Sequence, residues 1–443
     1  MRFVQTIRNI FKIEDLRARL IYTLAIVALY RLGKYVTLPG IDPSQLGALK
    51  AQTSQGLMGL LDMFSGGAFS QASVFALGIM PYISASIVVQ LLGIVFPYFQ
   101  KLQKEGESGR RKMNQYTRYL TVAILILQAP TYLVNLTSQL PASAFVLENG
   151  FFFKLSSTII LTAGTMFVMW LGERITDKGI GNGISLIIMI GIVARLPQNF
   201  IFEAGTRMNG AGGPIGLIVE IVILFVIILG TILLVQGTRR VPVQYARRIV
   251  GNKQYGGVRQ YIPLKVNAAG VMPIIFAQAI MMLPIIIAGY SNSSSGFVVA
   301  FSNMYGFWYN LVTAILIILF TYFYTAITIN PVQMAEDMKK NGGFIPGIKP
   351  GRKTVEFFDT IMSRITLPGS IFLALIAILP AIAVKFSVTP QFAQFFGGTS
   401  LLILVGVVLD TLQQIESHLL MRHYDGLMKS GRVKGRSGAV TSI

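Results

Sequence analysis

The chain has 443 residues, of which 53% are hydrophobic and only 13% are charged, and its mean hydropathy is +0.62. A soluble domain carries about 25% charged residues, so this composition excludes an ordinary soluble protein and favours a chain whose apolar side chains face lipid. The absence of cysteine excludes disulfides, thiolate catalysis and thiolate metal sites. The formal net charge is +20. Such a charge would suggest nucleic-acid binding in a soluble protein, but in a membrane protein basic cytoplasmic loops are the first explanation.

Ten apolar segments predict membrane-spanning helices, because about 20 mostly apolar residues are needed to cross the hydrocarbon core. Three of them are weaker than the rest: 20–38 ends in charged residues, 75–96 holds several polar residues, and 182–200 is interrupted by an arginine and a proline. No cleavable signal peptide is expected, since the first 19 residues are charged and no small-residue cleavage site follows the first span. In chain order the ten segments are 20–38, 75–96, 119–137, 155–172, 182–200, 215–236, 268–289, 308–330, 366–384 and 398–416.

The basic residues alternate along the chain in a way that supports this number of spans. Lys and Arg accumulate in the cytoplasmic loops of membrane proteins, and 31 of the 38 fall in six alternate segments if the N-terminus lies inside. Deleting any weak span would place several basic loops on the opposite face. We therefore expect ten spans with both termini in the cytoplasm. The six inside segments are 1–19, 97–118, 173–181, 237–267, 331–365 and 417–443.

The apolar stretch 57–74 is too short to span the bilayer and contains Asp62 and the pair Gly66-Gly67. A short, interrupted segment of this kind suggests a re-entrant half-helix. Non-helical backbone at membrane depth persists only where protein or a water-filled cavity surrounds it, so this interpretation implies a cavity on the outer side. The alternative is an amphipathic loop on the membrane surface, and composition alone does not decide between the two.

The ten spans divide into two groups of five, residues 1–213 and 214–443. Because each group has an odd number of spans, a repeat must be inverted in the membrane, and inverted repeats commonly build a central pathway between them. The two groups show no evident sequence identity, so the pattern of spans alone supports this division.

Eight short motifs follow one another along the chain: MFSGGAFS at 63–70, FALGIMPYISASI at 75–87, KEGESGRRK at 104–112, GTMFVMWLGE at 164–173, GIGNGIS at 179–185, PLKVN at 263–267, FIPGIKPG at 344–351 and GGTSLLI at 397–403. In their joint order and spacing the chain resembles the SecY family, and the matches extend from about residue 13 to residue 436.

The resemblance implies an all-α integral membrane protein with ten transmembrane helices in two inverted five-helix halves around a central pore, plus a re-entrant plug half-helix. It implies a channel rather than an enzyme. The channel would pass unfolded secretory polypeptides across the bacterial inner membrane and release transmembrane segments sideways into lipid. No cofactor or metal is expected. The implied partners are the SecE and SecG subunits, the SecA motor ATPase, the ribosome through its RNA, signal sequences, nascent polypeptides and the lipid bilayer.

An aliphatic ring is implied at the waist of the pore. Ile79 and Ile83 have a spacing that places them on one helix face, and bulky apolar side chains at a constriction exclude water and ions by dewetting. Without the resemblance, isoleucines in so apolar a chain are ordinary packing or lipid-facing residues. The residues of the implied ring are Ile79, Ile83, Ile188, Ile275 and Ile403.

The half-helix 57–74 is implied to be a plug in the outer funnel of the idle channel. Its two adjacent glycines weaken a helix by about 1 kcal/mol each relative to alanine, and a weak helix with few fixed contacts can be displaced. We expect a channel that lacks 61–71 to leak ions. The implied plug residues are Asp62, Met63, Phe64, Ser65, Gly66 and Gly67.

A lateral gate is implied between the second and seventh spans, 75–96 and 268–289. Pro81, Pro273 and Pro284 interrupt the backbone ladder of these helices and favour bending, although kinks at proline are common in transmembrane helices. For the polar residues at the gate, the alternative is an ordinary interhelical hydrogen bond, worth about 1 kcal/mol. The implied polar cluster is Gln90, Thr117 and Asn267.

The inside loops 237–267 and 331–365 are long and basic, and long loops are usually functional or disordered. The positive-inside bias alone explains their charge, whereas the resemblance implies that they bind SecA or the phosphates of ribosomal RNA, contacts that weaken with salt. The second loop departs from the family pattern, because Lys349 replaces the usual arginine and loses its planar fork. The implied partner-binding residues are Arg239, Arg240, Arg247, Arg248, Lys349 and Arg352.

Two other classes of protein are the alternatives. An ion-coupled secondary transporter would also have inverted halves and would place ionisable groups at mid-membrane; the candidates, Glu220 and Asp410, both lie toward helix ends. A membrane enzyme needs a nucleophile–base pair or a metal cluster, and the only histidines are His418 and His423, near the C-terminus. No Gly-rich nucleotide motif occurs, so energy for transport must come from a partner or from the membrane potential.

Overall fold

The structure is a computed structural model in which helices predominate. It describes residues 13–47, 59, 62–146, 150–210, 213–245, 248–250, 253–255, 259–278, 280–281 and 303–429. The longer helices are α2 (Glu14–Gly33), α5 (Met80–Val95), α7 (Glu107–Gln139), α8 (Phe151–Lys178), α9 (Gly183–Val193), α10 (Leu196–Asn209), α11 (Gly213–Gln236), α14 (Phe307–Thr328), α16 (Arg352–Lys385) and α18 (Gly398–Lys429). The shorter ones are η1 (Pro43–Gln45), α6 (Pro97–Lys104), η2 (Ala142–Ala144), α15 (Pro331–Lys340), α17 (Pro390–Ala393) and η3 (Gln394–Phe396).

Seven helices in the described part of the chain are long and apolar enough to cross a membrane, and they coincide with seven of the ten predicted segments. The predicted span 75–96 corresponds to α5 and continues into α6 at a bend of 103°. The first predicted span, 20–38, is not among the seven: the helix there, α2, begins at Glu14 and ends at Gly33, with Glu14 and Asp15 in its first turn, where acidic residues complement the helix dipole. The predicted span 268–289 is described only as far as residue 281.

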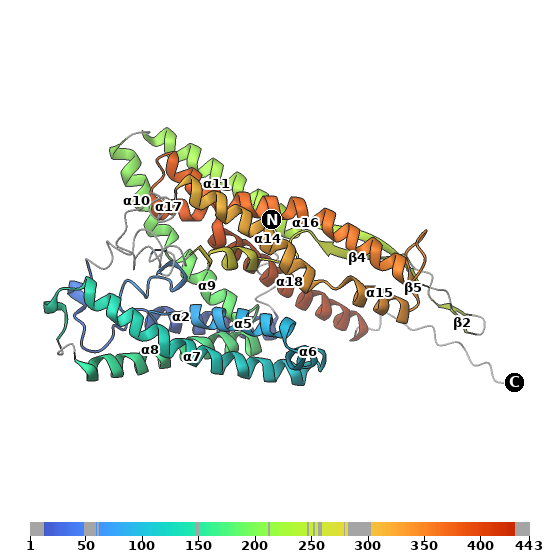
Figure 1. The fold of residues 1–443 in the computed structure, drawn as a ribbon, viewed down its shortest axis with the longest axis horizontal. Coiled ribbons are helices and arrows are strands. Elements are labelled where there is room, and N and C mark those ends of the chain that lie inside the picture. The colour runs from blue at the N-terminus through green and yellow to red at the C-terminus, as the bar shows by residue number, and fades with distance from the viewer. Residues whose placement is uncertain are drawn as a thin grey trace.

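The helices form two layers that follow the order of the chain (Figure 1). The N-terminal helices α2, α5, α7 and α8 make one layer, and the C-terminal helices α11, α14, α16 and α18 make the other. Helix α9 runs between the layers and leads into α10, from which the chain enters α11. The two layers therefore take their helices from the two ends of the chain.

The predicted loops 237–267 and 331–365 are not separate flexible connectors, because they pack together. The strands β1 (Thr238–Tyr245), β4 (Arg259–Lys265) and β5 (Gly343–Phe344) form a three-stranded sheet in the order β4-β1-β5, with both pairs antiparallel. The short strands β2 (Arg248–Val250) and β3 (Lys253–Tyr255) form a second, antiparallel pair.

The sheet packs on α15 and on the first turns of α16 through an apolar core of its own. Val241 and Val243 alternate along β1, so both side chains reach the same face, where they meet Phe358 and Met362 of α16. In Figure 1 the strands lie at the opposite end of the molecule from α10 and α17. A predicted pair of loops is therefore one folded unit at one end of the helices.

Candidate functional site

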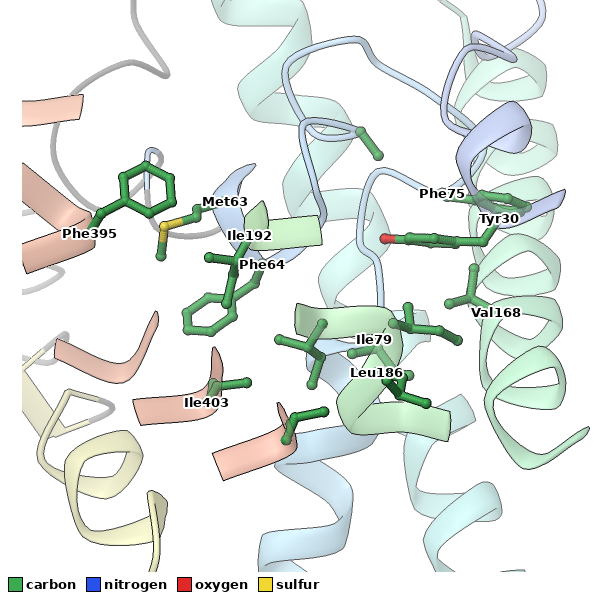
Figure 2. Packing of buried hydrophobic residues seen from close by; sticks show 14 of the residues in the cluster. Tyr30, Met63, Phe64, Phe75, Ile79, Val168, Leu186, Ile192, Phe395 and Ile403 are labelled. Atoms are coloured by element: carbon green, nitrogen blue, oxygen red, sulfur yellow. The ribbon is translucent and has the colours of Figure 1, made fainter. Parts of the chain in front are cut away.

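One apolar cluster joins the two layers of helices. It takes Ile187 and Ile192 from α9, Phe64 from the segment before α5, and Ile403 from α18. In Figure 2 the side chains of Met63 and Phe64 lie among those of Ile192, Phe395 and Ile403. At this point the N-terminal and C-terminal helices therefore contact each other through buried apolar side chains.

The structure brings four of the five ring isoleucines to this cluster. Ile79, Ile188 and Ile403 are buried members of it, and Ile83 is half-buried and packs against it. Ile275 does not join them: it is half-buried, and from its segment the cluster takes Val271 in the described residues. Ile274, the neighbour of Ile275, is buried instead in a separate core of C-terminal helices. The role of these residues in a pore stays a prediction.

The backbone before α5 explains how Ile79 reaches the cluster. The helix begins at Met80 and not at residue 75, so Ile79 is its N-cap, and the backbone N–H of Ile83 donates to the Ile79 carbonyl at 3.1 Å in the first turn. Gly78 has φ +56°, a conformation that favours glycine and ends the preceding turns. Pro81 stands in the first turn, where its missing N–H leaves no bond broken, so it starts the helix and does not kink it.

The predicted plug segment is buried, but only a short part of it is helical. Among the described residues, 59 and 62–64 are helical and residues 65–72 form turns, so 57–74 is not one half-helix. The break follows from Gly66 and Gly67, which have φ +65° and +88°. Gly66 also lies against Gly191 of α9, where a Cβ on Gly191 would come within 3.2 Å of the Gly66 Cα. A side chain at either position would therefore separate the segment from α9.

The expectation of few fixed contacts is wrong for this segment, because four side chains from other segments bind it. The carboxylate of Asp62 pairs with Arg195 and accepts the backbone N–H of Ser70 at 2.8 Å. The donors that reach its backbone carbonyl groups are Tyr30 Oη to Ser65 at 3.2 Å, Arg31 Nη1 to Gly66 at 3.2 Å and Tyr132 Oη to Phe69 at 3.0 Å. Sequence analysis missed these four partners, since bonds to backbone carbonyl groups follow no sequence pattern.

The three predicted gate residues are bonded to different partners. Gln90 of α5 accepts a hydrogen bond from Tyr324 Oη of α14 at 2.9 Å. Thr117 donates to the carbonyl of Met113 in its own helix at 3.0 Å. Asn267 is buried, and its Oδ1 has no hydrogen-bond partner in the described structure. The trio is therefore not a hydrogen-bonded cluster among the described residues; the polar contact between the two layers at this place is Gln90–Tyr324.

The predicted partner-binding residues lie on the folded unit that contains the sheet. Arg239 and Arg240 are exposed on β1, and Lys349 and Arg352 are exposed around the start of α16, where Arg352 pairs with Glu356 at 3.5 Å. Arg247 lies outside the described residues, and of Arg248 only the backbone is described. The exposed basic side chains share one packed scaffold.

The two acidic candidates of the transporter alternative differ in their surroundings. Glu220 is buried in α11 and pairs with Arg207. Asp410 is exposed on α18. Among the residues that the structure describes, no group of three His, Asp or Glu side chains could hold a metal ion; His418 is half-buried, and the side chain of His423 is not described.

Comparisons with known proteins identify the family of the chain. The SecY family profile matches residues 73–412. The protein translocase subunit SecY of Streptomyces scabiei is 44% identical over 440 residues, covering 95% of this chain and 98% of that protein.

Two solved structures also have a similar fold. A structure described as a protein-conducting channel has a TM-score of 0.58 at 17% identity, covering 90% of this chain and 92% of its own. The idle yeast Ssh1 complex bound to the yeast 80S ribosome has a TM-score of 0.56 at 13% identity, covering 96% and 94%. These relatives are translocase subunits and channels, so the chain is an all-α, multi-pass membrane protein of a channel family and not an enzyme. The chain belongs to the SecY family.

Proposed function

We propose that the chain is the pore-forming subunit of a bacterial translocon and passes unfolded polypeptides across the inner membrane. The observation that carries this proposal is the apolar contact between the two layers, in which Ile79, Ile188 and Ile403 are buried together. A purely apolar constriction excludes water and ions by dewetting. It also offers no fixed polar partner to a passing chain, so it can admit polypeptides of any sequence.

The closed state is sealed on one side of the constriction by the segment that contains Met63 and Phe64. Its apolar side chains enter the cluster, while Asp62 is held by Arg195. The seal is the plug, residues 62–67. Its removal should open an ion pathway without abolishing insertion of the protein in the membrane.

Transmembrane segments of a substrate leave sideways through a gate that includes α5 and the helix within 268–289. About 20 apolar residues exposed to lipid at such an opening partition out of the channel. The Gln90–Tyr324 hydrogen bond is the polar contact that must break on this side if α5 and α14 separate. The substitution Gln90→Leu, which removes this hydrogen bond, should favour the open gate.

The folded unit of β1, β4, β5 and α15 is the docking surface for a cytoplasmic partner, either a ribosome or the SecA motor. Arg239 and Arg240 face solvent from β1, while Lys349 and Arg352 do so beside it. Guanidinium and ammonium groups bind phosphate, and such binding weakens as salt rises.

If the docking surface lies in the cytoplasm, both termini lie there too, and the small subunits SecE and SecG complete the complex. The division of the chain at residues 213 and 214 separates the two halves of this channel.

Reconstituted liposomes test the proposed function. Protein translocation that requires an added motor or ribosome is the expected result. Uptake of a small solute driven by an ion gradient, with no protein translocation, would contradict it. A second measurement uses a variant without residues 61–71 in a planar bilayer, where we expect a larger idle ion current; an unchanged current would contradict the plug.

A further inference from the structure

A second set of buried charged side chains lies where α10 leads into α11, outside the constriction and the plug. Glu203 and Arg207 belong to α10, and Glu220 belongs to α11. The residue exposure is 0% for Glu203, 8% for Arg207 and 6% for Glu220. Arg207 Nε donates to Glu203 Oε1 at 3.2 Å, and its Nη2 donates to Glu220 Oε1.

The same side chains reach a third element, the connection between α16 and α17. Glu203 Oε2 accepts the backbone N–H of Thr389 at 3.0 Å and also the hydroxyl of Thr389. Arg207 Nη2 donates to the carbonyl oxygen of Phe386 at 3.2 Å. Figure 1 shows α10, α17 and the beginning of α11 together at the end of the molecule opposite the strands. Charged hydrogen bonds therefore join the last N-terminal helix to two separate parts of the C-terminal layer.

The composition of this set is not what packing alone requires. Ionisable side chains within membrane segments are expensive and are seldom without a function. Apolar residues of similar volume would often be neutral or stabilising at such a place. What the charged set adds is directional bonding: the loss of one partner leaves a buried charge unpaired, so the three elements stay together or separate at a large cost.

The position of the set indicates which motion it controls. Helix α10 ends at Asn209 and α11 begins at Gly213, so the set lies where the chain leads from the N-terminal to the C-terminal helices. Two bodies joined at a short connection turn about it, and hinges are a few residues at the ends of elements. Points beside the connection move least, and points on the far side, such as Gln90 and Tyr324, move most.

We propose that Glu203, Arg207, Glu220 and the backbone and side chain at 386–389 form a hinge clasp, which keeps one end of the two halves together while the gate side opens. This proposal rests on the proposed function, since it needs halves that turn. The clasp stays closed during translocation, in contrast to the plug, which must move. When the clasp is weakened, the halves lose their common pivot and the idle channel leaks.

The first experiment measures the idle ion current of the reconstituted complex in a planar bilayer. Arg207→Glu should raise the current about tenfold or more, because the change leaves three buried acidic groups together. The double variant Arg207→Glu/Glu220→Arg should return it to within about twofold, since each acidic group again has a basic neighbour. Lys385→Glu, an equal change of charge at an exposed residue, is the control. A current equal to that of the control, or no recovery in the double variant, would overturn the proposal.

If Arg207→Glu does not fold, Thr389→Val provides the same measurement with a smaller change. It removes the hydroxyl donor to Glu203 and keeps the backbone N–H bond. We expect a rise in current of about two- to fivefold, as for one lost hydrogen bond to a charged group that is partly replaced. A current within error of the unmodified channel would count against the clasp.

The second experiment measures distances between spin labels, for which a chain without cysteine is well suited. One pair of labels replaces Thr206 and Lys385, both exposed beside the clasp; the other replaces Val88 and Phe323, both exposed on α5 and α14. With a polypeptide stalled in the channel, the clasp pair should keep its distance to within about 2 Å, while the gate pair should lengthen. A clasp pair that lengthens as much as the gate pair overturns the clasp alone. If neither pair lengthens in a complex that translocates, both the turning of the halves and the clasp are overturned.

Discussion

The plug and the hinge clasp are both held by arginine–carboxylate pairs, but the two arginines differ in their contact with solvent. The side chain of Arg195, which pairs with Asp62, is 25% exposed, and that of Arg207 is 10% exposed. Exposure screens an ion pair and lowers its worth, whereas breaking a buried pair leaves an uncompensated charge. The pair at the plug is suited to being broken in a working cycle, and the pair at the clasp is suited to persist.

The two sets of bonds also tie different parts of the chain together. The polar contacts of the plug come from Tyr30, Arg31, Tyr132 and Arg195, all of which belong to the N-terminal half of the chain. The clasp joins that half to the C-terminal one. Separation of the layers would therefore leave the plug bonded to the N-terminal half and would strip away only its apolar contacts. Displacement of the plug is a second step that must break its polar contacts.

The largest expected effect is the loss of stability when the clasp loses its arginine. Arg207→Gln leaves Glu203 and Glu220 without their basic partner, and we expect a loss of about 3–5 kcal/mol in the free energy of unfolding. Reversible denaturation of the protein in mixed micelles measures it. Lys385→Gln removes one positive charge from an exposed site and should change the same quantity by less than about 0.5 kcal/mol. Equal effects of the two substitutions would contradict the contrast between clasp and surface.

The next effect comes from steric exclusion of the plug without any change of charge. A side chain at Gly191 meets the backbone of Gly66, with the added Cβ 3.2 Å from the Gly66 Cα. We expect Gly191→Val to disfavour the seated plug by about 1–3 kcal/mol, as for overpacking elsewhere. Since 1.4 kcal/mol is about tenfold in an equilibrium constant, the idle ion current should rise by about tenfold or more.

Gly406 provides a matched control for that substitution. It lies in α18, and a Cβ there would meet no heavy atom within 4 Å. Gly406→Val should leave the idle current within about twofold, because it overpacks nothing. A current that rises equally in both variants would mean that valine perturbs the membrane helices in general and does not act on the plug.

The membrane helices could be predicted because length and charge are properties of the sequence itself. A stretch of about 20 apolar residues has few alternatives to a spanning helix, and the basic loops 97–118 and 237–267 fix the order of faces. The boundaries could not be predicted as well. The start of α5 at Met80 depends on the φ of Gly78 and on the N-capping position of Ile79, which are local backbone choices.

The contacts of the candidate site were less accessible to prediction than its residues. The resemblance named Asp62 and Ile403, but nothing in the sequence pairs Asp62 with Arg195, which is 133 residues away. The loops 237–267 and 331–365 are long and basic, and the alternation of Val241 and Val243 within the first of them was the signal for a strand. Arg207 could have been sought as a partner, because Glu220, an acidic residue within an apolar span, requires a basic one.

A smaller effect is expected when the plug pair loses its charge. Asp62→Asn keeps an oxygen that can accept the N–H of Ser70 but removes the ionic attraction to Arg195. Because Arg195 is partly exposed, we expect the seated plug to lose about 1–2 kcal/mol, which corresponds to an idle current raised about five- to thirtyfold. The exchange Asp62→Arg/Arg195→Asp should recover part of the seal. An idle current in Asp62→Asn as high as in Gly191→Val would show that this pair, and not packing, seats the plug.

The smallest effect isolates one neutral hydrogen bond to the plug backbone. Tyr30→Phe removes the bond from Oη to the Ser65 carbonyl and retains the ring that stacks on Phe75, with centroids 6.2 Å apart. Interhelical hydrogen bonds in membrane proteins average about 0.6 kcal/mol, so the idle current should rise by about two- to threefold. The control is Tyr119→Phe at an exposed position of α7, which should leave the idle current unchanged. If Tyr30→Phe leaked more than Asp62→Asn, the plug would be held mainly by bonds to its backbone. The contrast between an Asp62–Arg195 pair that opens and a clasp that stays closed would then have to be abandoned.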